Sequence, residues 1–249
     1  MRRKPTQPWR HPDRPIVLGH RGARQRAPEN TLAAFELAAC EGASGVELDV
    51  RLDGSREVIV LHDRTLGRVT ESDDRDVETL STRELGEVSL ADGQRVPLLR
   101  EVLHWAVQRD VCVNIELKPD VGRREWLVRR VAALANQIPA APARLLLSSL
   151  DPGLLARLRR FAPEIPLAWV IAPPLRGFWR EPLLAGLGSV AAHPHVSLVD
   201  RARIAAVRRR AGVLNVWTVN ETRDARRLAD WGVDGIITDD PATIVGALR

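Results

Sequence analysis

The sequence predicts an α/β fold, a distorted (β/α)8 barrel of the TIM type with a small insertion after its third strand segment. Short β-rich runs alternate with helix-like segments along most of the chain, which is typical of a parallel sheet. The length of 249 residues lies within the range that one α/β barrel occupies. We therefore expect a single domain over residues 15–249.

The β-rich runs are short, and Val, Ile and Leu recur in most of them. In chain order they are IVLGH (16–20), GVELDV (45–50), VIVLHD (58–63), VCVNIELK (111–118), RLLLSS (144–149), PLAWVI (166–171), SVAAH (189–193), VLNVWTVN (213–220) and GIITDD (235–240). Helix-like segments such as NTLAAFELAACEG (30–42) lie between most of them, and Gly42 stands where a helix C-cap belongs.

One connection reduces these nine runs to eight barrel strands. The segment between residues 50 and 58 is too short for a crossover helix, so the second and third runs pair as an antiparallel hairpin. Asp53 and Gly54 form a turn signal for that hairpin. The remaining eight strands suit a closed barrel. An open Rossmann-type sheet is the weaker alternative, because no G-x-G-x-x-G motif follows the first strand.

Two segments stand outside the barrel pattern. Residues 1–14 are basic and rich in proline, without the apolar core of a signal peptide, and are expected to form a flexible arm on a cytoplasmic protein. Residues of about 64–97 lose the strand and helix pattern and are predicted to form the insertion. Within it, Ser81 and Glu84 indicate a capping box at the start of a short helix. The alternative for this insertion is a substrate lid.

The composition argues against some partners. The net charge of +5 would attract polyanions, but the arginines are interspersed with apolar residues, as on solvated helix faces. With no Tyr and three Phe, the chain offers little for base stacking, so we expect no nucleic-acid partner. No run reaches the roughly 18 apolar residues of a membrane span, so no stable membrane insertion is expected. Cys40 and Cys112 are interpreted as small core residues.

Three carboxylates are predicted to meet inside the barrel. Because side chains alternate along a strand, Glu47 and Asp49 share one face of the second strand, opposite its Val and Leu residues. Glu116 lies in the same way on its strand. Buried carboxylates need a positive partner, and a hard divalent cation, Mg²⁺ or Ca²⁺, is the simplest one. The alternative is that the second strand is an edge strand with a wet face.

Two histidines and two positively charged side chains complete the predicted site. His20 and His62 each end a strand, and a hairpin loop with an even number of residues would place His62 on the face of the carboxylates. Imidazoles beside a metal suit a general base and a general acid. Arg21 and Lys118 suit the oxygens of a phosphate ester, although a plain ion pair with a neighbouring carboxylate also explains the lysine. Phosphoester cleavage fits this set best.

The remaining histidines carry no predicted chemistry. They are assigned structural or surface positions: His11, His104, His193 and His195.

At this point the sequence resembles the glycerophosphodiester phosphodiesterase family. The matching pieces are HRGARQRAPENTLAAFELA (20–38), GVELDVRL (45–52), VIVLHD (58–63), NIELKP (114–119), VWTVNE (216–221) and GVDGIITDDP (232–241). They occur in family order over nearly the whole chain. In the PENT piece, Asn30 or Thr31 can cap the first helix, while Glu29 either supports the site or favours the positive helix end.

The resemblance implies a (β/α)8 barrel and a role for each site residue. It implies that His20 and His62 act as the acid–base pair and that a divalent cation binds Glu47, Asp49 and Glu116. It also implies that Arg21 and Lys118 lie at the phosphate and that Trp217 lies beside the glycerol end of the substrate. Plain barrel filling is the alternative for the tryptophan.

The implied reaction is hydrolysis of a small glycerophosphodiester to glycerol 3-phosphate and an alcohol. The main alternative is a phospholipase D-type hydrolase acting on lysophospholipids, for which the apolar stretch at 171–188 would supply a lipid groove. A barrel that only binds phosphate esters is a further alternative. The head group, the choice of Mg²⁺ or Ca²⁺ and the oligomeric state stay open.

Overall fold

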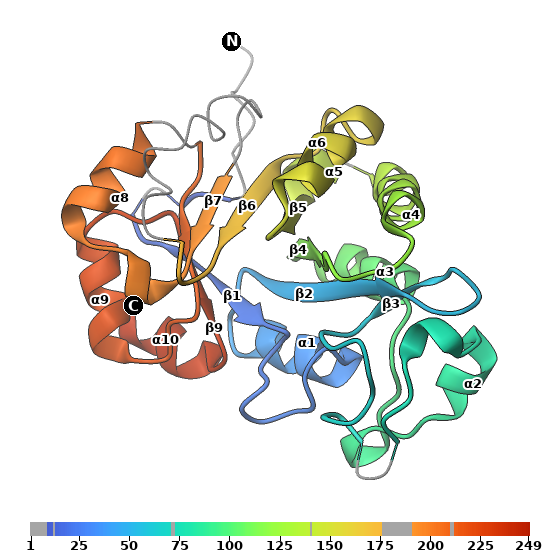
Figure 1. Ribbon diagram of the computed structural model, residues 1–249. Helices are drawn as coiled ribbons and strands as arrows, with labels where there is room; N and C mark the ends of the chain where they lie inside the picture. Colours follow the sequence, from blue (N-terminus) through green and yellow to red (C-terminus); the bar gives the residue numbers. More distant parts are fainter. Residues whose placement is uncertain (1–8, 12, 71–72, 140, 176–190, 210–211) are drawn as a thin grey trace.

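The computed structural model describes residues 9–11, 13–70, 73–139, 141–175, 191–209 and 212–249, and it contains a nearly closed barrel of eight parallel strands (Figure 1). The strands follow one another in the order β7-β6-β5-β4-β2-β1-β9-β8. Two isolated parallel bridges, Ala192 with Leu214 and His195 with Trp217, lie between the two end strands. The predicted α/β barrel is confirmed.

The barrel strands are β1 (Ile16–His20), β2 (Gly45–Leu52), β4 (Cys112–Leu117), β5 (Leu145–Ser149), β6 (Leu167–Ile171), β7 (Ala191–Pro194), β8 (Asn215–Val216) and β9 (Gly235–Thr238). The helices are α1 (Leu32–Cys40), α3 (Leu99–Arg109), α4 (Arg124–Asn136), α5 (Ala141–Arg144), α6 (Pro152–Phe161), α8 (Arg201–Arg208), α9 (Thr222–Asp230) and α10 (Pro241–Ala247). Figure 1 shows them around the outside of the barrel.

The main core lies between the strands and these helices. Val46, Leu48 and Val50 of β2 are fully buried in this cluster, as their alternation predicts. The other face of β2 is therefore turned to the barrel interior, where the polar residues collect.

The predicted hairpin is present, but its loop does not have the even number of residues on which the predicted position of His62 depended. Strand β3 (Val58–Val60) pairs antiparallel with β2, with Leu52 opposite Val58, so the loop 53–57 has an odd number of residues. Val50 therefore lies opposite Val60, and a continued strand would place His62 on the outer face. Instead β3 ends at Val60 and the chain leaves the sheet. The prediction that the hairpin loop has an even number of residues was wrong.

The segment after β3 folds into a small unit with its own apolar cluster. It contains η1 (Val77–Thr79), α2 (Thr82–Glu87) and η2 (Ala91–Gly93), and Figure 1 shows it beside the β2–β3 hairpin. Leu66, Val77 and Leu85 are buried together there, separate from the main core. Ser81 accepts a bond from the Glu84 N–H, and Glu84 accepts one from the Ser81 N–H, which confirms the capping box.

Part of the N-terminal stretch contacts the barrel. Trp9 is buried in a cluster with Ile16 and Leu18 of β1, at the end of the barrel where the strands begin. The Arg10 guanidinium lies 3.0 Å from the carboxylate of Asp234. These contacts anchor at least residues 9 and 10 to the domain.

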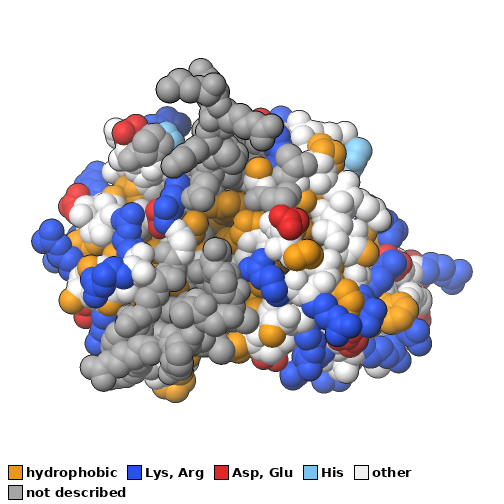
Figure 2. All heavy atoms as spheres, turned by 90° about the horizontal axis from the view of Figure 1, so that it is seen from above, with side chains coloured by type: hydrophobic (Ala, Val, Ile, Leu, Met, Phe, Trp, Pro, Cys, Tyr) orange, Lys and Arg blue, Asp and Glu red, His pale blue; other side chains and the backbone are white. Residues whose placement is uncertain are grey.

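The face of the molecule seen in Figure 2 is not uniformly basic. On the side seen in Figure 2, Lys and Arg side chains are spread over both halves of the molecule, with acidic side chains between them.

In the described part of the chain, no helix combines the length and the apolar character that crossing a bilayer needs. Of the apolar stretch at 171–188, residues 176–188 lie outside the described residues.

The two cysteines differ in exposure, which corrects their joint assignment to the core. Cys112 is buried in β4, whereas Cys40 is exposed at the end of α1. Burial raises the pKa of the Cys112 thiol to about 11. We expect one thiol per chain to react with Ellman's reagent at pH 8, with the second appearing only after unfolding. A Cys40→Ser variant with an equally reactive thiol would contradict this assignment.

Candidate active site

All eight predicted site residues line one cavity of about 460 Å³ at the carboxyl ends of the barrel strands. The thirteen lining residues are His20, Arg21, Glu47, Asp49, His62, Asn114, Glu116, Lys118, Leu150, Val170, His193, Trp217 and Ile237. In α/β barrels this end carries the functional site.

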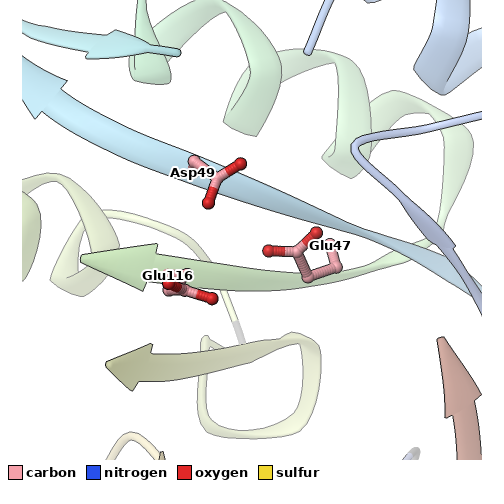
Figure 3. A group of neighbouring side chains, drawn as sticks. All are labelled: Glu47, Asp49 and Glu116. Atoms are coloured by element: carbon pink, nitrogen blue, oxygen red, sulfur yellow. The ribbon is translucent and has the colours of Figure 1, made fainter. Parts of the chain in front are cut away.

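Glu47 and Asp49 project from β2, and Glu116 projects beside them from the neighbouring strand β4 (Figure 3). Each can offer a carboxylate oxygen within 4.8 Å of the other two. Asp49 and Glu116 are register partners, which explains their proximity. Because β2 is buried between β1 and β4, the alternative of a wet edge strand is wrong.

The electrostatics of the three carboxylates favour a bound cation. Burial, reinforced by Asp49 and Glu116, raises the pKa of Glu47 well above its usual range. Burial also raises the pKa of Glu116, although Lys118 opposes this. Close, buried carboxylates with raised pKa values carry an unfavourable charge that a hard divalent cation neutralises. Their oxygen donors therefore fit Mg²⁺ or Ca²⁺.

Asp49 is the most connected of the three. Burial acts to raise its pKa, but Lys118 and Arg21 lower it below its usual range. Lys118 Nζ lies 3.2 Å from an Asp49 oxygen and 3.1 Å from a Glu116 oxygen, so the ion pair that the sequence left open is present. Arg21 Nε lies 3.1 Å from the other Asp49 oxygen. Asp49 therefore stays ionised.

The PENT piece holds this carboxylate from the side of the first helix. Asn30, in the left-handed region at φ 57°, donates from Nδ2 to Asp49 at 3.1 Å. Thr31, not Asn30, caps α1 by accepting the N–H of Ala34. Glu29 accepts a bond from Arg21 at 2.9 Å and lies outside the first turn of the helix. Of the two interpretations of Glu29, the contacts favour support of the site.

The HRG piece forms a tight turn directly after β1. Arg21 has a φ of 56° and Gly22 a φ of 86°, and a Cβ on Gly22 would come within 2.6 Å of Ala34. Only glycine fits this close approach. The backbone N–H of Arg21 donates to the carbonyl of Glu47 at 2.9 Å. The turn thus attaches the arginine to the carboxylate strand.

His20 is oriented by a carboxylate that the sequence analysis did not select. Its Nδ1 lies 2.6 Å from Asp239, and its Nε2 faces Glu47 at 4.0 Å. Burial lowers the pKa of His20, against the raising effect of Asp239. Burial acts to raise the pKa of Asp239, but the bond to His20 contributes to lowering it to about 2. Its position right after the last strand was the available signal.

His62, which also lines the cavity, has a similar arrangement. Its Nδ1 lies 2.6 Å from Asp63, and Asp63 also accepts a bond from Arg68. Arg68 in turn makes two bonds to Glu29, at 2.7 and 2.8 Å. Burial lowers the pKa of His62, and Asp49 opposes this. Both histidines therefore present Nε2 to the cavity side while a carboxylate holds Nδ1.

These observations agree with comparisons with known proteins. Residues 20–243 match the glycerophosphoryl diester phosphodiesterase family. The chain belongs to this family. It is 30% identical over 245 residues to the glycerophosphodiester phosphodiesterase of Caldanaerobacter subterraneus, covering 94% of this chain and 98% of that protein.

Solved structures of glycerophosphodiester phosphodiesterases share the fold. The Oleispira antarctica phosphodiesterase, solved with the product sn-glycerol-3-phosphate, superposes with a TM-score of 0.84 at 27% identity, covering 94% of this chain and 96% of that one. The Thermotoga maritima glycerophosphodiester phosphodiesterase gives 0.78 at 28% identity, covering 95% and 99%. The protein is thus a glycerophosphodiester phosphodiesterase, a phosphoric diester hydrolase.

One residue that lines the cavity of this glycerophosphodiester phosphodiesterase was not predicted to lie there. His193, expected at a structural or surface position in a loop, lies on β7 and lines the cavity. Trp217 is half-buried beside it and donates from Nε1 to the carbonyl of His193 at 2.7 Å. The ring of His195 meets Trp217 edge-on at 5.1 Å. The tryptophan is held in place from both sides.

Proposed function

We propose that this enzyme hydrolyses small glycerophosphodiesters, such as glycerophosphocholine or glycerophosphoethanolamine, to glycerol 3-phosphate and an alcohol. The observation that carries the proposal is one cavity in which three clustered carboxylates lie beside two histidines, each held by its own aspartate. The product bound to the Oleispira relative is the one expected here.

Glu47, Asp49 and Glu116 would hold a divalent cation, Mg²⁺ or Ca²⁺. The bound cation would supply Lewis-acid stabilisation of the charge on phosphoryl oxygens. Arg21 and Lys118 add positive charge at the same edge of the cavity and would bind the remaining phosphoryl oxygens. Trp217 would pack against the glycerol carbons.

The histidines would move the protons. With Nδ1 bonded to Asp239, His20 has Nε2 free to accept a proton from the neighbouring glycerol hydroxyl or from a water, whose oxygen then bonds to phosphorus as the bond to the leaving alcohol breaks. Attack by water gives glycerol 3-phosphate directly, whereas attack by the hydroxyl gives a cyclic phosphodiester that a water then opens to glycerol 3-phosphate. His62, protonated at Nε2 and held by Asp63, would give its proton to the leaving alcohol. Burial lowers the pKa of both histidines. This favours the neutral form of His20, which a base requires, and it makes the protonated form of His62 a stronger acid but a less populated one at neutral pH.

The first test is release of glycerol 3-phosphate from glycerophosphocholine by the chelated protein, with Mg²⁺ or Ca²⁺ added back separately. We expect release to return with at least one ion. If both ions leave the protein silent, micellar lysophospholipids are the next substrates to measure, and turnover of those alone would replace this proposal with the lipid alternative.

Replacing His62 by alanine should lower turnover by about 10²-fold or more and leave metal binding largely intact, because the side chain acts on the leaving group. Steady-state kinetics and calorimetric titration of Mg²⁺ or Ca²⁺ measure the two effects. A variant at His104, an exposed histidine on α3, serves as the control. Normal turnover by the His62→Ala enzyme would remove the acid role.

A further inference from the structure

The wall of the cavity that faces the carboxylates contains one buried histidine without a predicted role. His193 projects from β7, which lies four strands from β2 in either direction around the barrel, so the two strands stand opposite each other. Its side chain is 1% exposed, and it lines the cavity with the apolar residues Val170 and Ile237. The carboxylate side of the cavity is charged, whereas this side is mostly apolar.

The hydrogen bonds of His193 leave one ring nitrogen without a partner. The Asn215 side-chain amide nitrogen lies 3.0 Å from His193 Nε2, so the amide donates and Nε2 accepts. In the neutral ring the proton is then on Nδ1. Among the described residues, Nδ1 has no hydrogen-bond partner. Burial lowers the pKa of His193 to about 3, which agrees with a neutral ring.

A second polar atom of the cavity has no partner either. Asn114 lines the cavity from β4, and its Oδ1 is buried and makes no hydrogen bond to the described residues. A hydroxyl group both accepts and donates, so it can pair with the N–H donor of His193 or with the carbonyl acceptor of Asn114. Buried polar groups left unpaired are costly, so a ligand that pairs with them is favoured over one that does not.

We propose that the Nδ1–H of His193 donates a hydrogen bond to the terminal hydroxyl of the substrate's glycerol group and selects glycerol esters over esters that lack this hydroxyl. The inference rests on the proposed function, which places the phosphate at Arg21, Lys118 and the cation that the three carboxylates would hold. The terminal hydroxyl is the glycerol group farthest from phosphorus and therefore reaches the opposite wall. Trp217 lies beside His193 and holds its backbone through the bond to the His193 carbonyl.

The test uses one pair of diester substrates and one pair of phosphate monoesters. The two members of each pair differ by the terminal hydroxyl. The substrates are glycerophosphocholine and the phosphocholine diester of propane-1,2-diol, and kcat/KM is measured for each. The esters are sn-glycerol 3-phosphate and propane-1,2-diol 1-phosphate, and Kd is measured by calorimetry with Mg²⁺ or Ca²⁺ present. We expect the wild type to prefer the glycerol compound by about 10- to 100-fold in both measurements.

Two variants separate the hydrogen bond from the shape of the wall. His193→Leu removes the donor and should reduce both preferences to below about 3-fold, whereas His193→Asn retains an N–H near the Nδ1 position and should keep part of each. Ser148→Ala, which removes another buried polar group of the barrel that is not among the residues lining the cavity, is the control and should keep the wild-type preference. Circular dichroism checks that each variant folds.

The outcomes distinguish this inference from the proposed function. If the wild type releases no glycerol 3-phosphate with either ion, the proposed function fails, and the ratio of the two Kd values still tests His193. If the wild type turns over glycerophosphocholine and His193→Leu keeps the full preference, the inference is overturned while the function stands. Equal affinity of the wild type for both phosphate esters would also overturn it.

Discussion

Replacing Asp49 by asparagine should abolish measurable binding of the divalent cation and lower turnover by about 10³-fold or more. Asp49 is the carboxylate whose pKa Lys118 and Arg21 lower despite its burial, so this proposed ligand is ionised at neutral pH. Asparagine keeps the shape and one oxygen but removes the charge. Calorimetric titration with Mg²⁺ and Ca²⁺ measures binding, and release of glycerol 3-phosphate measures turnover.

Asp224→Asn is the matched control for this prediction, because it makes the same chemical change on α9, where Asp224 pairs with Arg227 at the surface. The control should bind the cation and turn over substrate as the wild type does. Unchanged cation affinity in a folded Asp49→Asn protein would mean that the cation does not bind at the carboxylate cluster.

Removing His20 should lower kcat by about 10³-fold, because it removes the imidazole that lies between Asp239 and Glu47 and is proposed to accept the proton. His20→Ala removes the proposed base, whereas Asp239→Asn keeps the ring but weakens its orientation, so its rate should lie between those of His20→Ala and the wild type. Asp239 acts to raise the pKa of His20. In Asp239→Asn the acidic limb of the kcat/KM profile should therefore move to lower pH.

The neighbouring substitution Asp240→Asn is the control for this pair, since that side chain caps α10 and does not touch His20. It should leave the position of the acidic limb unchanged. A limb that moves to higher pH in Asp239→Asn, or a His20→Ala enzyme with a wild-type rate, would exclude His20 as the base.

Much of this site could be predicted because period-two alternation is a local property. Alternation along β2 and β4 placed Glu47, Asp49 and Glu116 on one face, and the strand ends placed His20 and Arg21 beside them. The capping box of Ser81 and the hairpin also depend on a few consecutive residues. Local patterns of this kind survive in any fold that forms those strands and helices.

The missed residues depend on how the barrel closes. Asp239 reaches His20 because β9 pairs with β1 across more than 200 residues of sequence, and His193 faces the cavity because β7 stands opposite β2. The predicted route by which His62 reaches the site was wrong for a different reason. His62 lines the cavity because the chain leaves β3 after Val60, and the run VIVLHD does not show where a strand stops.

Arg68 links the insertion to two loops of the active site. It bonds Asp63, which holds His62, and Glu29, which holds Arg21, so one side chain of residues 64–97 joins two separate loops of the site. A loop graft from a relative would therefore have to bring a matching arginine and keep both acidic partners. The unit that can be exchanged between such barrels is the insertion together with its PENT and HD loops.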